Sequence, residues 1–387
     1  MPAHAILHLY ELSIPLFMVV WLTEFDVTAA TLGGIVTAGY AMWGLGAIPG
    51  GKLADRYGSK RLIAGCLVGM GASFLLLSLS FDILVMAIAL VCWGTAASVY
   101  HPAGLTVISK GIDQQGSAFA YHGMAGNVGI GLGPLIVAVL LVFFEWRLVA
   151  ALLTVPTFFV FVLTVFTEFD ETTAVTDDDR SESNLTFRDG SILLFTSAFA
   201  VIFGIVVIYG LYLRGALTFL PGVLADFRLF ERVVVGGREI EPSQFVYTWI
   251  LLVGVVGQYA GGKLIDRLDR TEIGLGGALL ALSALSVLFV FVADRGIAFL
   301  LVLSVFFGFV LFMIQPFEHA IIAEHTSIET RGLSYGYMSL GVFGVGAVGA
   351  TVTGVVLTYF SMSVLFVLLS GTALVGSGLT AFLYFQY

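Results

Sequence analysis

Three polar side chains near the start of the chain share one face of a predicted helix. His4, His8 and Glu11 follow one another at intervals of four and three residues, and residues so spaced lie on the same side of an α-helix. Imidazole and carboxylate groups take up and release protons, so this face is suited to proton transfer, with Glu11 as the carrier. Metal ligation fits the spacing too, but a stripe without cysteine or a paired cluster is poor evidence, so we predict no metal site.

Arg214 stands inside a long apolar run. A charge at the centre of a membrane costs about 2.5–3.5 kcal/mol, so such a residue is rarely exposed to lipid. One interpretation is a structural ion pair with an acid such as Glu11 or Glu318. The other is an anion site, because a planar guanidinium binds carboxylate and phosphonate groups through two parallel hydrogen bonds. The two interpretations are compatible.

Further polar residues interrupt later apolar runs. A single histidine is more often satisfied by a neighbouring carbonyl than functional, and His101 is singled out by the repeat described below. The candidate residues for a substrate or proton site are His8, Glu11, His101, Arg214, Gln315, Glu318 and His319, with His122 and Asn127 as supporting residues behind them.

The composition is that of a membrane protein. Hydrophobic residues make up 59% of the 387 residues and charged residues 11%, whereas soluble proteins contain about 25% charged residues. The net charge of −9 gives no reason to expect nucleic-acid binding. Both cysteines, Cys66 and Cys92, fall inside apolar runs, so a disulfide framework is not expected.

Polar residues divide the chain into about a dozen apolar runs, each close to the 20 or so residues that span a bilayer as a helix. This pattern predicts an all-α membrane protein with twelve transmembrane helices. The first six are expected at Ala3–Leu22, Ala29–Pro49, Leu62–Leu79, Ile83–Ile108, Ser117–Phe144 and Leu148–Thr167, and the others near Tyr209, Gly254, Leu282, Gly308, Gly346 and Leu374. We expect a first bundle over 1–167, an acidic linker over 168–190 and a second bundle over 191–387.

The two halves repeat one another. Gly94, His101 and Pro102 recur as Gly308, Gln315 and Pro316, and Gly126, Gly129 and Gly131 recur as Gly341, Gly344 and Gly346. These correspondences predict two pseudo-symmetric six-helix bundles, and substrate sites in such proteins lie near the bilayer midplane between the repeats.

A basic, glycine-containing stretch, GKLADRYGSKR, follows the second apolar run and ends at Arg61. Gly51 and Gly58 are expected to supply the backbone angles of a tight turn there. Short loops rich in lysine and arginine stay in the cytoplasm, which places both termini on the cytoplasmic side.

This stretch resembles the loop signature of the major facilitator superfamily. The matching residues are Gly51, Leu53, Asp55, Arg56, Gly58, Lys60 and Arg61, and a second copy follows at Gly262, Lys263, Leu264, Ile265, Asp266 and Arg267. The resemblance implies that the two loops gate the cytoplasmic side. It implies that Asp55 docks near Arg331–Ser334 and that Asp266 faces the region near Ser117.

Small residues line the fifth apolar run. Gly126, Gly129 and Gly133 suit close helix packing. Gly129, Gly133 and Pro134 also resemble the antiporter signature of the same superfamily. The run from Tyr100 to Pro134 is similar to its fosmidomycin-resistance branch, which implies a proton-driven exporter of a polar or anionic compound.

The duplicated bundles and the resemblance together predict a secondary active transporter that works by alternating access, and the resemblance implies a central cavity lined by helices 1, 4, 7 and 10. Proton-coupled export of a small organic anion is the leading hypothesis, and ion-coupled uptake of an organic or inorganic anion is the alternative. A receptor lacks a visible output domain, and an enzyme lacks an evident nucleophile and base. We expect no cofactor, a proton or sodium as the coupling ion, a small-molecule substrate, the lipid bilayer of the plasma membrane and no obligate protein partner.

Overall fold

A computed structural model describes residues 1–111, 115–168, 186–196, 198–227, 233–235, 238–292 and 295–387. Twelve stretches of helix among them are long and apolar enough to cross a membrane. The predicted all-α fold with twelve transmembrane helices is confirmed.

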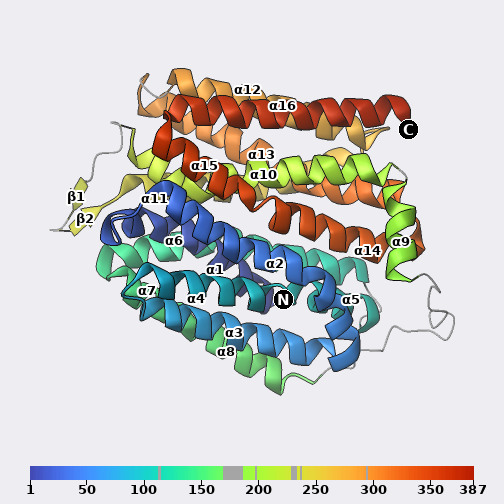
Figure 1. Cartoon of the computed structure of the whole chain (residues 1–387), viewed down its shortest axis with the longest axis horizontal. Coiled ribbons are helices and arrows are strands. Elements are labelled where there is room, and N and C mark those ends of the chain that lie inside the picture. Colours follow the sequence, from blue (N-terminus) through green and yellow to red (C-terminus); the bar gives the residue numbers. More distant parts are fainter. Residues whose placement is uncertain (112–114, 169–185, 197, 228–232, 236–237, 293–294) are drawn as a thin grey trace. The chain divides into compact units, whose positions relative to one another are not determined.

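The helices follow one another along the whole described chain (Figure 1). Those of the first half are α1 (Pro2–Glu24), α2 (Ala29–Tyr57), α3 (Ser59–Ser78), α4 (Ile83–Ala97), α5 (Tyr100–Gly111), α6 (Gln115–Phe143), α7 (Trp146–Leu152) and α8 (Thr154–Phe166). Those of the second half are α9 (Phe187–Phe195), α10 (Phe199–Ala225), α11 (Pro242–Ile265), α12 (Thr271–Val292), α13 (Ile297–His325), α14 (Ile328–Ser339), the π-helix η3 (Leu340–Val345), α15 (Val348–Tyr359) and α16 (Met362–Gln386).

Two spans are broken where proline removes a backbone donor. Pro102 has no N–H for the carbonyl of Ser98, and α4 ends one residue earlier, at Ala97. Pro156 likewise cannot bond to the carbonyl of Leu152, where α7 ends. The first break starts α5 just before His101, so it helps to set the position of that histidine.

The structure corrects the predicted end of the second helix. Helix α2 continues through Pro49 and includes Gly51, which therefore lies in helix and not in a turn. Gly58 does have the positive φ of 83° that the sequence led us to expect. The turn is shorter than predicted because the residues after Pro49 continue the helix as far as Tyr57.

A short hairpin interrupts the polar segment before α11. Strands β1 (Val233–Val235) and β2 (Arg238–Ile240) pair antiparallel, with Val233 opposite Ile240. No strands are expected in the predicted all-α fold, so these two strands are an addition to it.

The described chain divides into two compact units. The first contains Met1–Ile14 and Ala38–Leu185, and the second contains Pro15–Thr37 and Thr186–Tyr387. The first half of α2 groups with the second unit because it packs on α15. There the Thr37 hydroxyl donates to the carbonyl of Ala347 over 2.8 Å, and the N–H of Thr351 donates back to the Thr37 oxygen over 3.1 Å.

Equivalent glycines make equivalent contacts within the two units. Gly94 of α4 packs against the backbone of Gly39 in α2, and Gly308 of α13 packs against the backbone of Ile250 in α11. The fourth and tenth spans therefore approach the second and eighth in the same way. This supports the internal repeat that was inferred from the sequence.

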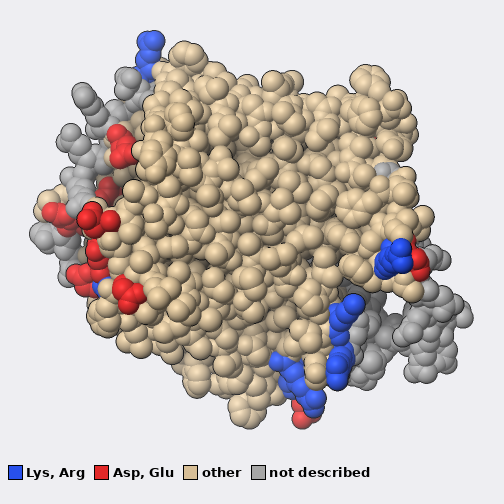
Figure 2. Space-filling view, viewed as in Figure 1, with Lys and Arg blue, Asp and Glu red and all other residues tan. Residues whose placement is uncertain are grey.

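Few charged residues are visible on the described surface of the spanning helices (Figure 2). Figure 2 shows charged side chains gathered at the edges of the view, whereas the face between them is formed by uncharged residues of the described part. Large apolar side chains such as Phe158, Phe159 and Phe306 are exposed on the described surface, as expected for helices that contact lipid.

Candidate functional site

Helix α1 is the most buried span, with 72% of its apolar window inside the described structure. In the first unit it carries a polar face within this buried environment. His4 is 8% exposed and Glu11 is 5% exposed. The hydroxyl of Tyr40 donates to the backbone carbonyl of Glu11 over 3.2 Å, which ties α1 to α2 beside the carboxylate.

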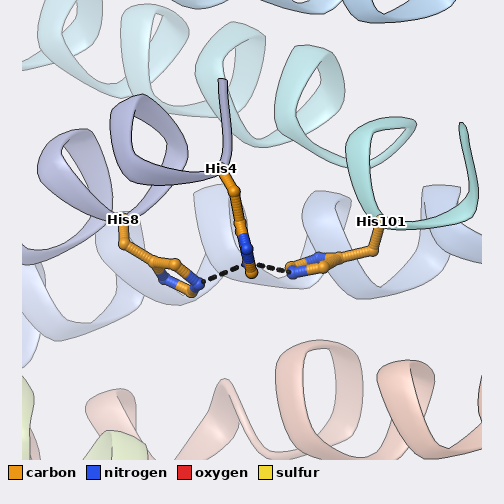
Figure 3. A group of neighbouring side chains, drawn as sticks. All are labelled: His4, His8 and His101. Atoms are coloured by element: carbon orange, nitrogen blue, oxygen red, sulfur yellow. Dashed lines mark hydrogen bonds between the residues drawn. The ribbon is translucent and has the colours of Figure 1, made fainter. Parts of the chain in front are cut away.

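The histidines predicted on α1 meet the histidine of α5. His8 Nδ1 lies 2.6 Å from Glu11 Oε2, and His8 Nε2 lies 3.1 Å from His4 Nε2. His101 Nε2 lies 3.3 Å from the same His4 nitrogen (Figure 3). We call His4, His8 and His101 the histidine triad. The structure therefore brings three of the predicted site residues, His8, Glu11 and His101, into one group around His4.

Aromatic rings enclose the histidine triad. The ring of His122 stacks on that of His4 at 4.0 Å between centroids, and its backbone carbonyl accepts a hydrogen bond from His4 Nδ1 over 2.8 Å. Trp43 stacks on His101 at 5.8 Å with the rings nearly parallel. His122 therefore lies directly beside His4, and its carbonyl fixes the orientation of that ring; its supporting role at a site stays a prediction.

Glycines of α6 allow α1 to approach closely. A methyl group added at Gly126 would lie 2.6 Å from the ring of His4, and one at Gly133 would lie 2.9 Å from the Cα of Leu9. At Gly129 it would clash with the carbonyl of Ala5. The glycine stripe, which precedes Pro134 in α6, therefore serves the packing role predicted from the sequence and positions the polar face of α1.

In the second unit, Arg214 lies on α10, whose apolar window is 61% buried. Its side chain is 4% exposed, and its guanidinium carbon lies 5.1 Å from the ring centroid of Phe343 on η3. An arginine over an aromatic face is stabilised by the negative potential of the ring. The π-helix thus supplies part of the environment of this buried cation.

Glu318 is buried in the same unit, with 3% exposure on α13. Its Oε1 atom has no hydrogen-bond partner among the described residues. Both Glu318 and Arg214 lie close enough to Tyr209 to act electrostatically on its phenol, which donates to the carbonyl of Leu311 over 2.9 Å. A buried carboxyl group and a buried guanidinium group thus lie near the same tyrosine.

The remaining candidates of the second unit differ in their surroundings. The Gln315 side-chain oxygen accepts a hydrogen bond from Gln258 Nε2 over 3.1 Å. His319 is exposed, and its Nδ1 donates to the carbonyl of Gln315 over 2.8 Å. His319 therefore has the ordinary helix-carbonyl partner of a single histidine. Asn127 of the first unit is half-buried and makes no side-chain hydrogen bond within the described part of the chain.

The loop residues proposed for gating lie at helix ends. Lys60 and Arg61 begin α3, and the guanidinium of Arg56 lies 5.2 Å from the ring centroid of Tyr57. Asp266 caps the carboxyl end of α11, and the N–H of Arg267 donates to the carbonyl of Leu264 over 3.0 Å. The side chains of Asp55 and Ser117 lie outside the described residues.

Sequence reasoning missed Tyr209 and Gln258 as members of the polar group in the second unit. Each is a polar residue within an apolar run, so the signal was present. It was weak because neither residue has a counterpart in the internal repeat that drew attention to Gln315.

Comparisons with known proteins agree with this architecture. A family model described as "Major Facilitator Superfamily" matches residues 5–230 and 234–387. The fosmidomycin resistance protein of Escherichia coli (strain K12) is 24% identical over 334 residues, which cover 83% of this chain and 75% of that protein. A Na(+), Li(+), K(+)/H(+) antiporter of Planococcus maritimus is 27% identical over 160 residues, 40% of this chain and 38% of the antiporter.

Solved structures show the same fold. An inward-facing, occupied bacterial homolog of the human lysosomal transporter Spinster gives a TM-score of 0.77 at 13% identity, over 100% of this chain and 95% of that one. The nucleoside transporter NupG, as its D323A mutant, gives 0.73 at 13% identity, over 99% and 100% of the two chains. The resemblance inferred from the signature loops and the fifth run is confirmed. The chain belongs to the Major Facilitator Superfamily and is a multi-pass membrane transporter of small molecules, not an enzyme.

Proposed function

We propose that this transporter exports a small organic anion across the plasma membrane in exchange for protons, with both termini in the cytoplasm. The two bundles would rock about a site near the bilayer midplane, which is where transporters with such repeats bind substrate. The proton gradient supplies the work, and its electrical part is worth about 2.3 kcal/mol per charge per 100 mV.

The observation that carries the proposal is the buried cation of the second unit. Arg214 is 4% exposed and lies within a membrane-spanning helix. An arginine in such a position faces the protein interior or a water-filled cavity and marks a functional site by default. Its planar, permanently charged group binds carboxylates, phosphates and phosphonates in a bidentate manner. The substrate class that it favours is therefore anionic.

The proton partner is assigned to a carboxylate of the same unit. Glu318 is buried in α13 and acts, together with Arg214, on Tyr209. A carboxylate that is exposed alternately to the two sides of the membrane can take up a proton on one side and release it on the other. In an exchange cycle the anion and the proton are carried in separate steps, the anion at Arg214 during the outward movement and the proton on Glu318 during the return.

Export and proton exchange are supported by the names of the relatives. One is a resistance protein for fosmidomycin, a phosphonate, and the other is an antiporter that moves protons against alkali cations. Ion-coupled uptake of an anion would use the same buried charges. Sodium would be the coupling ion in place of the proton if Glu318 bound Na⁺. The flux measurements described below distinguish uptake from export, and sodium coupling from proton coupling.

Accumulation in cells tests the proposal. The chain would be expressed in a fosmidomycin-sensitive bacterium that lacks its own exporter, and accumulation of fosmidomycin and other small anions would be measured. Wild-type protein is expected to lower accumulation of at least one compound. Arg214→Lys, which keeps the charge but loses the bidentate geometry, is expected to abolish this effect.

The control is Arg188→Ala, since Arg188 is exposed on α9. It should export as the wild type does. Equal amounts of each variant in the membrane must be verified by immunoblot. Undiminished export by Arg214→Lys and Arg214→Ala would contradict the substrate role, and increased accumulation with wild-type protein would indicate uptake instead.

A further inference from the structure

We propose that the histidine triad of the first unit binds one divalent transition-metal ion, with Zn²⁺ as the best-suited ion. His4, His8 and His101 each offer one nitrogen, and these atoms all lie within 4.8 Å of one another. The three rings point toward a common centre from α1 and α5 (Figure 3). Only the first two ligands are close in sequence, because His101 lies 97 positions after His4.

Hydrogen bonding fixes the free nitrogen of His4. Its Nδ1 lies 2.8 Å from the backbone carbonyl of His122. A carbonyl can only accept, so the proton of the neutral imidazole is on Nδ1 and the lone pair is on Nε2. That Nε2 atom is the one that both other histidines approach.

The same reasoning applies to His8. Its Nδ1 lies 2.6 Å from Glu11 Oε2, so Nδ1 is the donor and the Nε2 of the neutral ring carries a lone pair. In this neutral tautomer, the His8 Nε2 atom with its lone pair lies 3.1 Å from the Nε2 atom of His4. Two lone pairs at that distance repel each other unless a cation lies between them.

A shared proton does not satisfy all three rings. His4 Nε2 has one lone pair in the plane of its ring, yet both His8 Nε2 and His101 Nε2 lie within 3.3 Å of it. A single lone pair accepts one well-aligned hydrogen bond. A metal ion accepts a lone pair from every nitrogen at once, so it explains the convergence of three Nε2 atoms.

The spacing matches a tetrahedral ion. Zn²⁺ binds imidazole nitrogen at about 2.0–2.1 Å, which places neighbouring ligand nitrogens about 3.3–3.4 Å apart. The pairs that include His4 are separated by 3.1 and 3.3 Å. The third pair lies within 4.8 Å, so His8 and His101, which are both only half-buried, would rotate toward each other when the ion binds. Three protein ligands leave one position open for water or an anion.

The surroundings of the ligands are those of a metal site. Metal-binding histidines donate their other N–H to a carboxylate or a backbone carbonyl, which fixes the ring and increases its basicity. Glu11 does this for His8, and the carbonyl of His122 does it for His4. The ring of Trp43 stacks on His101, and the ring of Tyr100 stacks on His4.

This proposal is independent of the direction and substrate of transport, because all ligands belong to the first unit and Arg214 belongs to the second. Its test uses binding alone. The whole chain would be purified in detergent with a histidine-free affinity tag and treated with a chelator. Co²⁺ would then be added and the visible d–d absorption of a tetrahedral or five-coordinate ion recorded, followed by displacement with Zn²⁺.

We expect one Co²⁺ per chain, displaced by one Zn²⁺, and a higher melting temperature with Zn²⁺. His101→Gln should weaken binding by more than about 100-fold, whereas Glu11→Gln, which replaces the carboxylate beside His8 by a neutral amide, should weaken it about 10–100-fold. His101→Cys should restore Zn²⁺ binding through its thiolate. His325→Ala, in the second unit next to Glu272, is the matched control and should bind as the wild type does.

Size-exclusion profiles and circular dichroism would establish that each variant is folded, and His8→Gln replaces His101→Gln if that variant is not. Absence of the d–d bands in the wild type would overturn the proposal. Wild-type affinity in the folded His101→Gln or His8→Gln variant would do the same, as would equal loss in His325→Ala.

Discussion

At the scale of single residues, two groups of buried ionisable side chains lie within the spanning helices of the described chain. The first unit has the histidine triad with Glu11, and the second has Arg214 and Glu318 near Tyr209. Intramembrane ionisable residues are costly, so their retention in spanning helices indicates use. The proposed division of labour assigns metal binding to the first group, and anion and proton binding to the second.

Replacement of Glu318 by Gln tests the proton assignment. The amide has nearly the same shape but cannot exchange a proton, so transport driven by a pH gradient should fall at least tenfold. Exchange of substrate for substrate, which needs no net proton movement, should continue. Both rates can be measured in proteoliposomes with a labelled anion.

Glu324→Gln provides the comparison on the same helix. Glu324 is exposed and accepts a hydrogen bond from Thr271, so its loss should leave both rates close to those of the wild type. A Glu318→Gln protein that still responds fully to the pH gradient would remove Glu318 as the proton carrier.

Most residues of the polar group in the first unit could be selected from the sequence, but their contacts with one another could not be predicted from it. Helical spacing alone placed His8 one turn from Glu11, and the structure shows them 2.6 Å apart. His101 was chosen through its match to Gln315 in the repeat and through the family resemblance of the run from Tyr100 to Pro134. Its contact with His4 depends on how α5 packs on α1, which no local pattern in the sequence encodes. For that reason the metal site proposed above could not be predicted from the sequence alone.

At the scale of helices, small residues decide how closely the spans pack. The glycines at 126, 129 and 133 of α6 have no side chains to hold α6 away from α1. The two backbones therefore come into contact at Gly129 and Ala5. Such close contacts are the usual means of helix association in membranes, where no hydrophobic driving force acts between helices.

Gly129→Ala is predicted to destabilise the first unit by about 1–3 kcal/mol, because the added methyl group overpacks the contact with Ala5. It should also weaken metal binding by displacing the start of α1. Gly123→Ala in the same helix is the matched control, since a methyl group there has no neighbour within 4 Å.

The control should be neutral or stabilising by up to about 1 kcal/mol, the difference in helix propensity between the two residues. Thermal unfolding in detergent measures both effects. Equal stability of the two variants would show that the stripe does not set the distance between α6 and α1.

The number of spans could be predicted because each needs about 20 apolar residues, but their breaks and ends could not. The break between α4 and α5 follows from Pro102, whereas Pro49 is accommodated inside α2. A proline in a membrane helix can be compensated by its neighbours. Its effect therefore depends on packing that becomes visible only in the structure.

At the scale of the whole molecule, the internal repeat was predicted correctly from glycine spacing. Gly94 and Gly308 make corresponding close contacts in the two units. The predicted boundaries at 168–190 remain a prediction, because the first half of α2 packs on α15 in the second unit through Thr37. Contact alone therefore does not define which segments move together.

The gating role of the signature loops also remains a prediction. Asp55→Asn should slow the transport cycle about tenfold or more while substrate affinity changes little, because a latch affects the rate of the conformational change. Asp266→Asn should act in the same direction if the repeat is functional as well as structural. Single-turnover transport and equilibrium binding separate rate from affinity, and normal cycling in both variants would show that the latch assignment is wrong.

The central claim is the exchange of an anion for protons, and simultaneous measurement of both fluxes tests it most directly. Proteoliposomes with an internal pH-sensitive dye would receive an imposed pH gradient in either direction and a labelled anion such as fosmidomycin. We expect substrate and proton to move in opposite directions and the anion to dissipate the gradient. Movement in the same direction, or transport that requires sodium and is indifferent to pH, would contradict it.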